Sequence, residues 1–144
     1  MSTFDSCIKL KNVTFPNDSK LETIGKYAFN GSSIEKIVIP DKITTFCDGI
    51  FNGCSNLKCI SYGSGTNLQF IEEQSIGFTD IKCFVVPSSV KKIDNKAFIF
   101  SRGLTVIEFE DNSEIGVINL SWFRYSPKLV IMIPSNSKKI SVKK

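Results

Sequence analysis

The chain has 144 residues, a formal net charge of +4 and no histidine. This length suits one domain, and an apolar content of 42% allows a buried core. The lack of histidine excludes Ser-His-Asp and Cys-His catalysis and histidine metal sites. The cysteines form no C-x-x-C pair, and no glycine-rich phosphate loop with its lysine occurs. We therefore expect no cofactor, no metal and no enzyme activity.

A repeat of 47 residues runs through the chain three times. Pro40, Pro87 and Pro134 are 47 residues apart. Self-similarity at a fixed period is typical of solenoids, in which each unit packs only on its neighbours. Each block divides into two similar units, because equivalent apolar positions alternate in spacing between 22 and 25 residues: Ile24, Phe46, Ile71, Ile93, Ile118 and Ile140.

Each unit carries an apolar triplet at positions i, i+3 and i+5. Positions i+3 and i+5 share one face of an extended strand, so we expect both to point inward. Five triplets follow this spacing in chain order: Leu10/Val13/Phe15, Ile34/Ile37/Ile39, Leu57/Ile60/Tyr62, Ile81/Phe84/Val86 and Leu104/Ile107/Phe109. A sixth, centred on Ile131 and Ile133, is irregular because Leu129 stands one place late. The spacing predicts about six units whose parallel strands line a concave sheet.

The rest of each unit supplies a second apolar pair and a turn. The pair, such as Ile24 with Phe29, is expected to fill the core from the opposite wall. The longer units gain residues after the triplet, in loops rich in Gly, Asn, Asp and Ser over 14–20, 61–67 and 108–114. Because these loops recur in every second unit, we expect them to line one edge of the solenoid.

Three segments carry a family resemblance: LETIGKYAFNGSSIEKIVIP (21–40), FNGCSNLKCI (51–60) and VKKIDNKAF (90–98). They resemble the BspA-like leucine-rich repeats, whose pattern is close to I-x-x-x-A-F-x-x-C-x-x-L-x-x-I-x-I-P. Ala28 and Ala97 match the Ala-Phe step, and Cys7 and Cys54 match the repeat cysteine, expected as small buried apolar filler. The sequence departs from the pattern where Ile76 and Phe123 lack the preceding alanine and where Ser101 replaces the cysteine.

The resemblance implies a domain of cell-surface or secreted proteins that adheres to host, matrix or cell-surface proteins. No signal peptide is visible at the N-terminus, so a cytoplasmic location stays open. The chain begins and ends partway through a unit, so residues 1–144 are expected to form a single repeat domain of a longer protein. N-x-S/T sequons at Asn12, Asn17, Asn30 and Asn119 support a secreted context only weakly.

The candidate partner-binding surface is the outward side of the strands. If i+3 and i+5 point in, i+2 and i+4 point out, which places on this face Lys36, Val38, Cys59, Ser61, Cys83, Val85, Val106 and Glu108. The row extends to Asn12 and Thr14 at one end and to Val130 and Met132 at the other. Exposed apolar patches mark interaction sites, although valine is also simply a good strand former.

Cys59 and Cys83 hold the same position on adjacent strands. Neighbouring strands lie about 4.8 Å apart, within the Cα separation that a disulfide tolerates. We therefore predict a pair of close thiols, with a disulfide as an option in oxidising conditions.

Two other functions remain open beside adhesion. An intracellular protein-interaction scaffold agrees with the missing signal peptide, and ends without capping units predict self-association into dimers or filaments. A nucleic-acid partner is not expected, because the basic residues concentrate in the tail at Lys138, Lys139, Lys143 and Lys144, without interleaved aromatics. No apolar stretch reaches the length of a membrane span.

Overall fold

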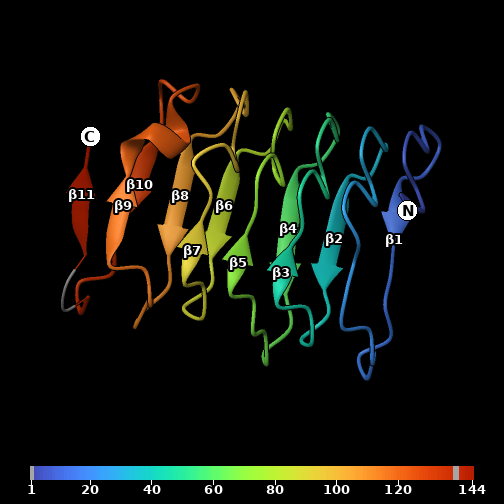
Figure 1. Cartoon of the computed structure of the whole chain (residues 1–144), viewed down its shortest axis with the longest axis horizontal. Helices are drawn as coiled ribbons and strands as arrows, with labels where there is room; N and C mark the ends of the chain where they lie inside the picture. The colour runs from blue at the N-terminus through green and yellow to red at the C-terminus, as the bar shows by residue number, and fades with distance from the viewer. Residues whose placement is uncertain (1, 138–139) are drawn as a thin grey trace.

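The chain folds into a parallel β-solenoid of about six coils (Figure 1). The computed structural model describes residues 2–137 and 140–144, so Lys138 and Lys139 of the basic tail lie outside the described residues. One wall holds the strands β1 (Asn12–Val13), β2 (Lys36–Ile39), β4 (Cys59–Tyr62), β6 (Cys83–Val86), β8 (Val106–Phe109) and β10 (Val130–Met132). The opposite wall holds β3 (Thr45–Phe46), β5 (Phe70–Ile71), β7 (Lys92–Ile93), β9 (Val117–Asn119) and β11 (Ser141–Lys143). A short 3₁₀ helix, η1 (Leu120–Phe123), follows β9.

The predicted triplets set the strand register. Ile37 pairs with Val13 on one side and with Ile60 on the other, and Ile107 pairs with Phe84 and Ile131. The irregular sixth unit therefore keeps its strand in register at Ile131. The next residue expected to point inward, Ile133, lies beyond β10 and is 41% exposed.

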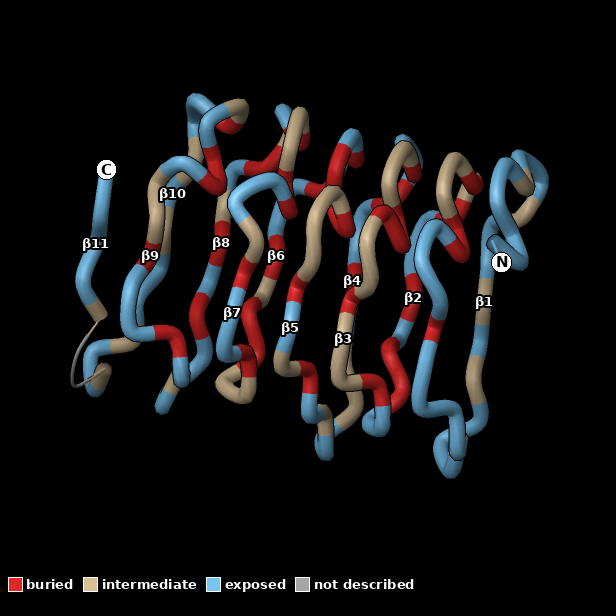
Figure 2. The backbone as a smooth tube through the Cα atoms, viewed as in Figure 1, coloured by how far each residue is buried: buried red, intermediate tan, exposed pale blue. Residues whose placement is uncertain are grey.

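The inward positions form one continuous core. The expected inward residues of β2, β6 and β8 are buried, whereas those of β1 and Tyr62 of β4 are half-buried. The second apolar pair fills the core from the other side, as predicted, and this wall also forms short parallel ladders, β3-β5-β7 and β9-β11. Figure 2 shows buried segments in all the middle coils, while the first coil and β11 are largely exposed.

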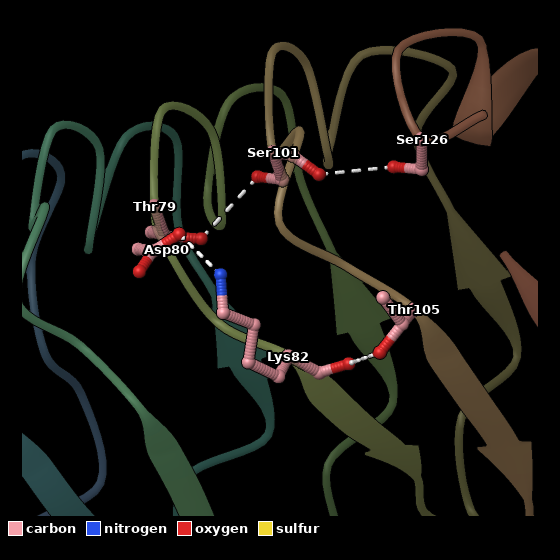
Figure 3. Close-up of polar contacts among 6 residues, drawn as sticks. All are labelled: Thr79, Asp80, Lys82, Ser101, Thr105 and Ser126. Carbon is pink, nitrogen blue, oxygen red and sulfur yellow. Dashed lines mark hydrogen bonds and ion pairs between the residues drawn. The ribbon is translucent and has the colours of Figure 1, made fainter. Parts of the chain in front are cut away.

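The repeat-cysteine position is a column of small hydrogen-bonding side chains. Its buried members are Ser32, Cys54, Thr79, Ser101 and Ser126. The Cys54 thiol donates to the Phe29 carbonyl, and the Ser126 hydroxyl donates to the Ser101 carbonyl, each over 3.0 Å. Figure 3 shows the part of this column from Thr79 to Ser126. Because Cys54, Ser101 and Ser126 each donate to a carbonyl of the preceding coil, the column ties coils together and is more than apolar filler.

The three predicted loops lie along one edge of the solenoid. Residues 14–20 follow β1, 61–67 begin within the end of β4, and 108–114 begin within the end of β8. Figure 1 shows the chain leaving β1, β4 and β8 at the same lower edge. The strand wall and this loop edge therefore meet along one border.

Candidate protein-binding face

The predicted outward residues share one surface, the strand face, defined as the outward side of β2, β4, β6 and β8. Pairing places Lys36 beside Cys59 and Val38 beside Ser61, and in the next ladder Cys83 beside Val106 and Val85 beside Glu108. Six of the eight are exposed, with Val38 at 56%, whereas Val85 and Val106 are half-buried. The face is therefore largely apolar, with a cation at one corner and a carboxylate at the opposite corner.

The strand face is divided between β4 and β6. These strands lie side by side, yet they belong to two separate hydrogen-bonded ladders, β1-β2-β4 and β6-β8-β10. At the junction the Tyr62 hydroxyl donates to the Val85 carbonyl over 3.1 Å. Burial raises the pKa of the Tyr62 hydroxyl well above its usual value, and Glu110 and Cys59 add to the increase. The hydroxyl therefore stays protonated and able to donate at neutral pH.

Cys59 and Cys83 flank this junction and are both free and exposed. Partial burial raises the pKa of the Cys83 thiol, and the Glu108 carboxylate and Cys59 raise it further. Because the thiolate is the reactive form, Cys83 is a weak nucleophile at neutral pH. The two thiols form no disulfide in the structure.

A pocket that spacing did not indicate lies where the strand face meets the loop edge. Its volume is about 450 Å³, and its lining includes Glu108, Glu110, Asp111, Met132 and Ile133. Three carboxylates beside two exposed apolar side chains would suit a basic, partly apolar group of a partner. The run of acidic residues after β8 was visible in the sequence, but its closeness to β10 depends on how the coils stack.

Two of the four sequon asparagines are engaged in hydrogen bonds. The Asn30 side chain donates to Asp5 over 2.9 Å and accepts from Asn52 over 3.0 Å. Asn119 accepts from the Ser121 backbone amide at the start of η1. Asn12 is exposed on β1, next to Lys36 of the strand face, so a glycan there would cover part of that face.

The described residues contain no group of three or more His, Cys, Asp or Glu side chains placed to hold a metal ion. No helix in the described part of the chain has the length and apolar character needed to cross a bilayer.

Comparison with known proteins places the repeats in a family. The family profile of the BspA type Leucine rich repeat region matches six copies, over residues 1–105 and 66–143. No curated protein matches the chain. The resemblance noted from the Ala-Phe steps and the repeat cysteines is confirmed.

Solved structures share the fold at low sequence identity. The pneumococcal vaccine antigen PcpA is similar over 90% of this chain, with a TM-score of 0.66 and 16% identity. A leucine-rich repeat protein of T. pallidum is similar over 83% of the chain, with a TM-score of 0.57 and 22% identity. The chain spans only 39% and 65% of the lengths of these two proteins. The likeness to these structures shows the shared fold, and the six matched copies show that the chain belongs to the BspA-type leucine-rich repeat family.

Proposed function

We propose that this domain is a recognition or adhesion module that binds protein partners through the strand face, at the cell surface. Its family supports a repeat module for protein interaction or adhesion. The observation that carries the proposal is the set of apolar side chains on the outward positions of β2, β6 and β8, bounded by Lys36 and Glu108. Solenoids bind partners on such extended strand-lined surfaces.

The physical argument rests on rigidity and on charge. The strand face stands on a core that runs through all the middle coils, so its side chains need little ordering when a partner binds. Burial of the exposed part of Val38 and its neighbours would supply hydrophobic free energy. The opposite charges of Lys36 and Glu108 would fix the orientation of a partner more than they would raise its affinity.

The cell-surface location is a separate part of the proposal. The family resemblance supports it, and so does the description of one similar structure as a vaccine antigen. The test is labelling of intact source cells with a membrane-impermeant amine reagent. Labelling of this protein would support adhesion, whereas protection in intact cells with labelling in lysed cells would favour the intracellular scaffold.

The binding part can be tested with one charged substitution and a matched control. Val38→Glu places a carboxylate on β2 of the strand face, at a position that is 56% exposed, so the fold should survive. Val117→Glu makes the same change on β9 of the opposite wall, where the valine is 48% exposed. Binding to immobilised laminin, collagen and fibronectin is measured for both variants, with circular dichroism to check folding.

We expect Val38→Glu to weaken binding about tenfold or more and Val117→Glu to change it little. Equal affinity for Val38→Glu and the unchanged protein would overturn the strand face as the binding surface. The acidic pocket lined by Glu108, Glu110 and Asp111 would then be the next surface to test.

Self-association is a second candidate function, favoured by the first described coil. The Phe4 ring lies parallel to that of Phe29 at 5.4 Å between centroids, and Phe4 remains 41% exposed. Ile8 of the same coil is 72% exposed. These side chains offer an apolar end on which another coil could stack.

A further inference from the structure

A row of aromatic rings crosses the turn edge of the last three coils, outside the strand face. Phe78, Phe100 and Tyr125 hold equivalent positions in these coils. Their ring centroids are 4.9 Å and 4.2 Å apart, with interplanar angles of 39° and 30°. In the two preceding coils the same position holds Gly31 and Gly53, so the row ends abruptly at Phe78, which is 48% exposed.

The backbone at this position is left-handed, and two of the rings occupy it under strain. The φ angles are 53° at Phe78 and 54° at Phe100, compared with 64° and 71° at Gly31 and Gly53. Glycine adopts this conformation freely, whereas a bulky side chain there is a true outlier. Strained residues of this kind cluster at functional sites. The first coil places Ser6 at this position with a φ of 56°, and the next two coils place glycine there, so the turn does not require an aromatic ring.

The open end of the row borders a notch of about 390 Å³, lined by Ser55, Phe78, Thr79, Asp80, Phe100, Arg102 and Gly103. Gly53 lies alongside, since its backbone amide donates to the carbonyl of Gly77, which precedes Phe78, over 3.0 Å. A Cβ added to Gly53 would meet only the backbone of Gly31, at 3.6 and 3.7 Å. The preceding coil therefore offers no side chain at this position to cover the outer side of the Phe78 ring.

The charges around the notch favour an acidic ligand. Arg102 lies with its guanidinium carbon 5.4 Å from the centroid of the Phe100 ring, and no ion pair involves it among the described residues. The Asp80 carboxylate is already paired with Lys82 over 2.6 Å, as Figure 3 shows. One unpaired cation therefore remains at the rim, and a guanidinium recognises a carboxylate through paired hydrogen bonds.

We propose that this notch binds an aromatic side chain of a partner protein, next to a carboxylate of the same segment. The aromatic ring extends the row beyond Phe78, over the place that Gly53 leaves open, and the carboxylate pairs with Arg102. The proposal rests on the proposed function as a protein-recognition module, but on a different surface. The stacked rings offer one terminal face rather than the flat platform that a row of sugars would need.

The test uses ¹⁵N-labelled protein and three short peptides: Ac-Glu-Trp-Glu-NH₂, Ac-Glu-Leu-Glu-NH₂ and Ac-Lys-Trp-Lys-NH₂. We expect the acidic tryptophan peptide to shift the amide signals of Gly53, Ser55, Phe78 and Gly103 in a saturable way. The leucine and lysine peptides should each bind at least about fivefold more weakly. Equal binding of the leucine peptide would overturn the aromatic part of the proposal, and equal binding of the lysine peptide would overturn the acidic part.

Three variants connect the result to named residues. Phe78→Gly removes the terminal ring at a position that suits glycine, so the protein should fold and the acidic tryptophan peptide should bind at least about fivefold more weakly. Arg102→Gln should remove the preference for the acidic peptide over the basic one. Phe70→Ala, which changes a phenylalanine 39% exposed on the opposite wall, is the control and should leave binding unchanged. Unchanged binding by Phe78→Gly, or signal shifts only at other residues, would contradict the proposal.

Failure of this proposal can be told apart from failure of the strand face. Val38→Glu should keep the peptide binding while it loses the matrix-protein binding. One outcome is that the acidic tryptophan peptide shifts no amide signal in the unchanged protein or in Val38→Glu, while Val38→Glu still loses matrix-protein binding. That result would overturn the notch as a binding site and leave the strand face as the binding surface.

Discussion

At the scale of single residues, the repeat imposes a chemical requirement rather than one amino acid. The column that contains Cys54 needs a small donor that reaches a carbonyl of the preceding coil. Serine meets this need at Ser101 and Ser126, whereas the Thr79 hydroxyl donates to the Ile76 carbonyl of its own coil. The family pattern writes cysteine here, so Ser101 looks like a departure in the sequence although it performs the same role.

Ser101 provides a direct test of this requirement. Its hydroxyl donates to the Ile76 carbonyl, which Thr79 also reaches over 3.1 Å. Because Thr79 would keep that carbonyl hydrogen-bonded, we expect Ser101→Ala to lower the free energy of unfolding by only about 1 kcal/mol. Ser101→Cys retains a weak donor and should lower it less. Urea unfolding of both variants measures this, and equal losses would show that packing rather than hydrogen bonding matters at this position.

The left-handed turn position that holds Phe78 and Phe100 could not be recognised from the sequence. The apolar periodicity aligns the core positions, which recur every 22 or 25 residues and are identifiable by their side chains. Gly31, Gly53, Phe78 and Phe100 share a backbone conformation and no side-chain property. They are spaced 22 or 25 residues apart like the core positions, but only the φ angles reveal that the two phenylalanines stand where glycine is favoured.

At the scale of strands, the repeat spacing predicts the strand register. It does not predict that the sheet is interrupted between β4 and β6. The i+3 and i+5 positions were correctly predicted to face the core, with Tyr62 as the least buried among the inner strands. The break between β4 and β6 could not be predicted, because β1 and β2 have the same 24-residue offset as β4 and β6 and remain paired. At the junction stands a tyrosine, whose hydroxyl bonds to the neighbouring strand, where the equivalent positions in the other blocks hold Phe15 and Phe109.

Tyr62→Phe should therefore weaken the contact between the two ladders. The substitution keeps the ring and removes the hydroxyl that donates to Val85, so we expect the free energy of unfolding to fall by about 1 kcal/mol at pH 7. The raised pKa of Tyr62 in the folded state makes the difference pH-dependent. The contribution is fully present below the unfolded pKa, about 10, and is lost as the pH rises toward the folded value.

The measurement compares denaturant unfolding of the two proteins from pH 7 to pH 11. The gap between them should close above about pH 10, while other titrating groups affect both proteins alike. A gap that stays constant up to pH 11 would contradict an interaction that depends on the protonated hydroxyl.

At the scale of the whole molecule, the solenoid separates its surfaces. The aromatic notch lies at the turn edge, outside the strand face, whereas the acidic pocket shares Glu108 with the strand face and lies at its border with the loops. The sequence placed the strand face and the loop edge, because both follow from the repeat itself. It did not place the acidic pocket or the notch, because each combines residues of adjacent coils that no single repeat contains.

The exposed apolar side chains of the first coil predict that two copies of the molecule associate through this coil. Phe4 continues the stack formed by Phe29 and Phe51, whose centroids are 5.8 Å apart, and one side of this stack is open to solvent. Burial of Phe4 and Ile8 against a second copy would remove exposed apolar surface and drive association. Light-scattering mass should then rise with concentration over a dilution series of about a hundredfold. Phe4→Asp should keep the protein monomeric at every concentration. Phe70→Asp, in β5 of the opposite wall, is the control and should associate as the unchanged protein does. A constant monomer mass of the unchanged protein across the series would rule out stacking through this end, because mass action requires association to increase with concentration.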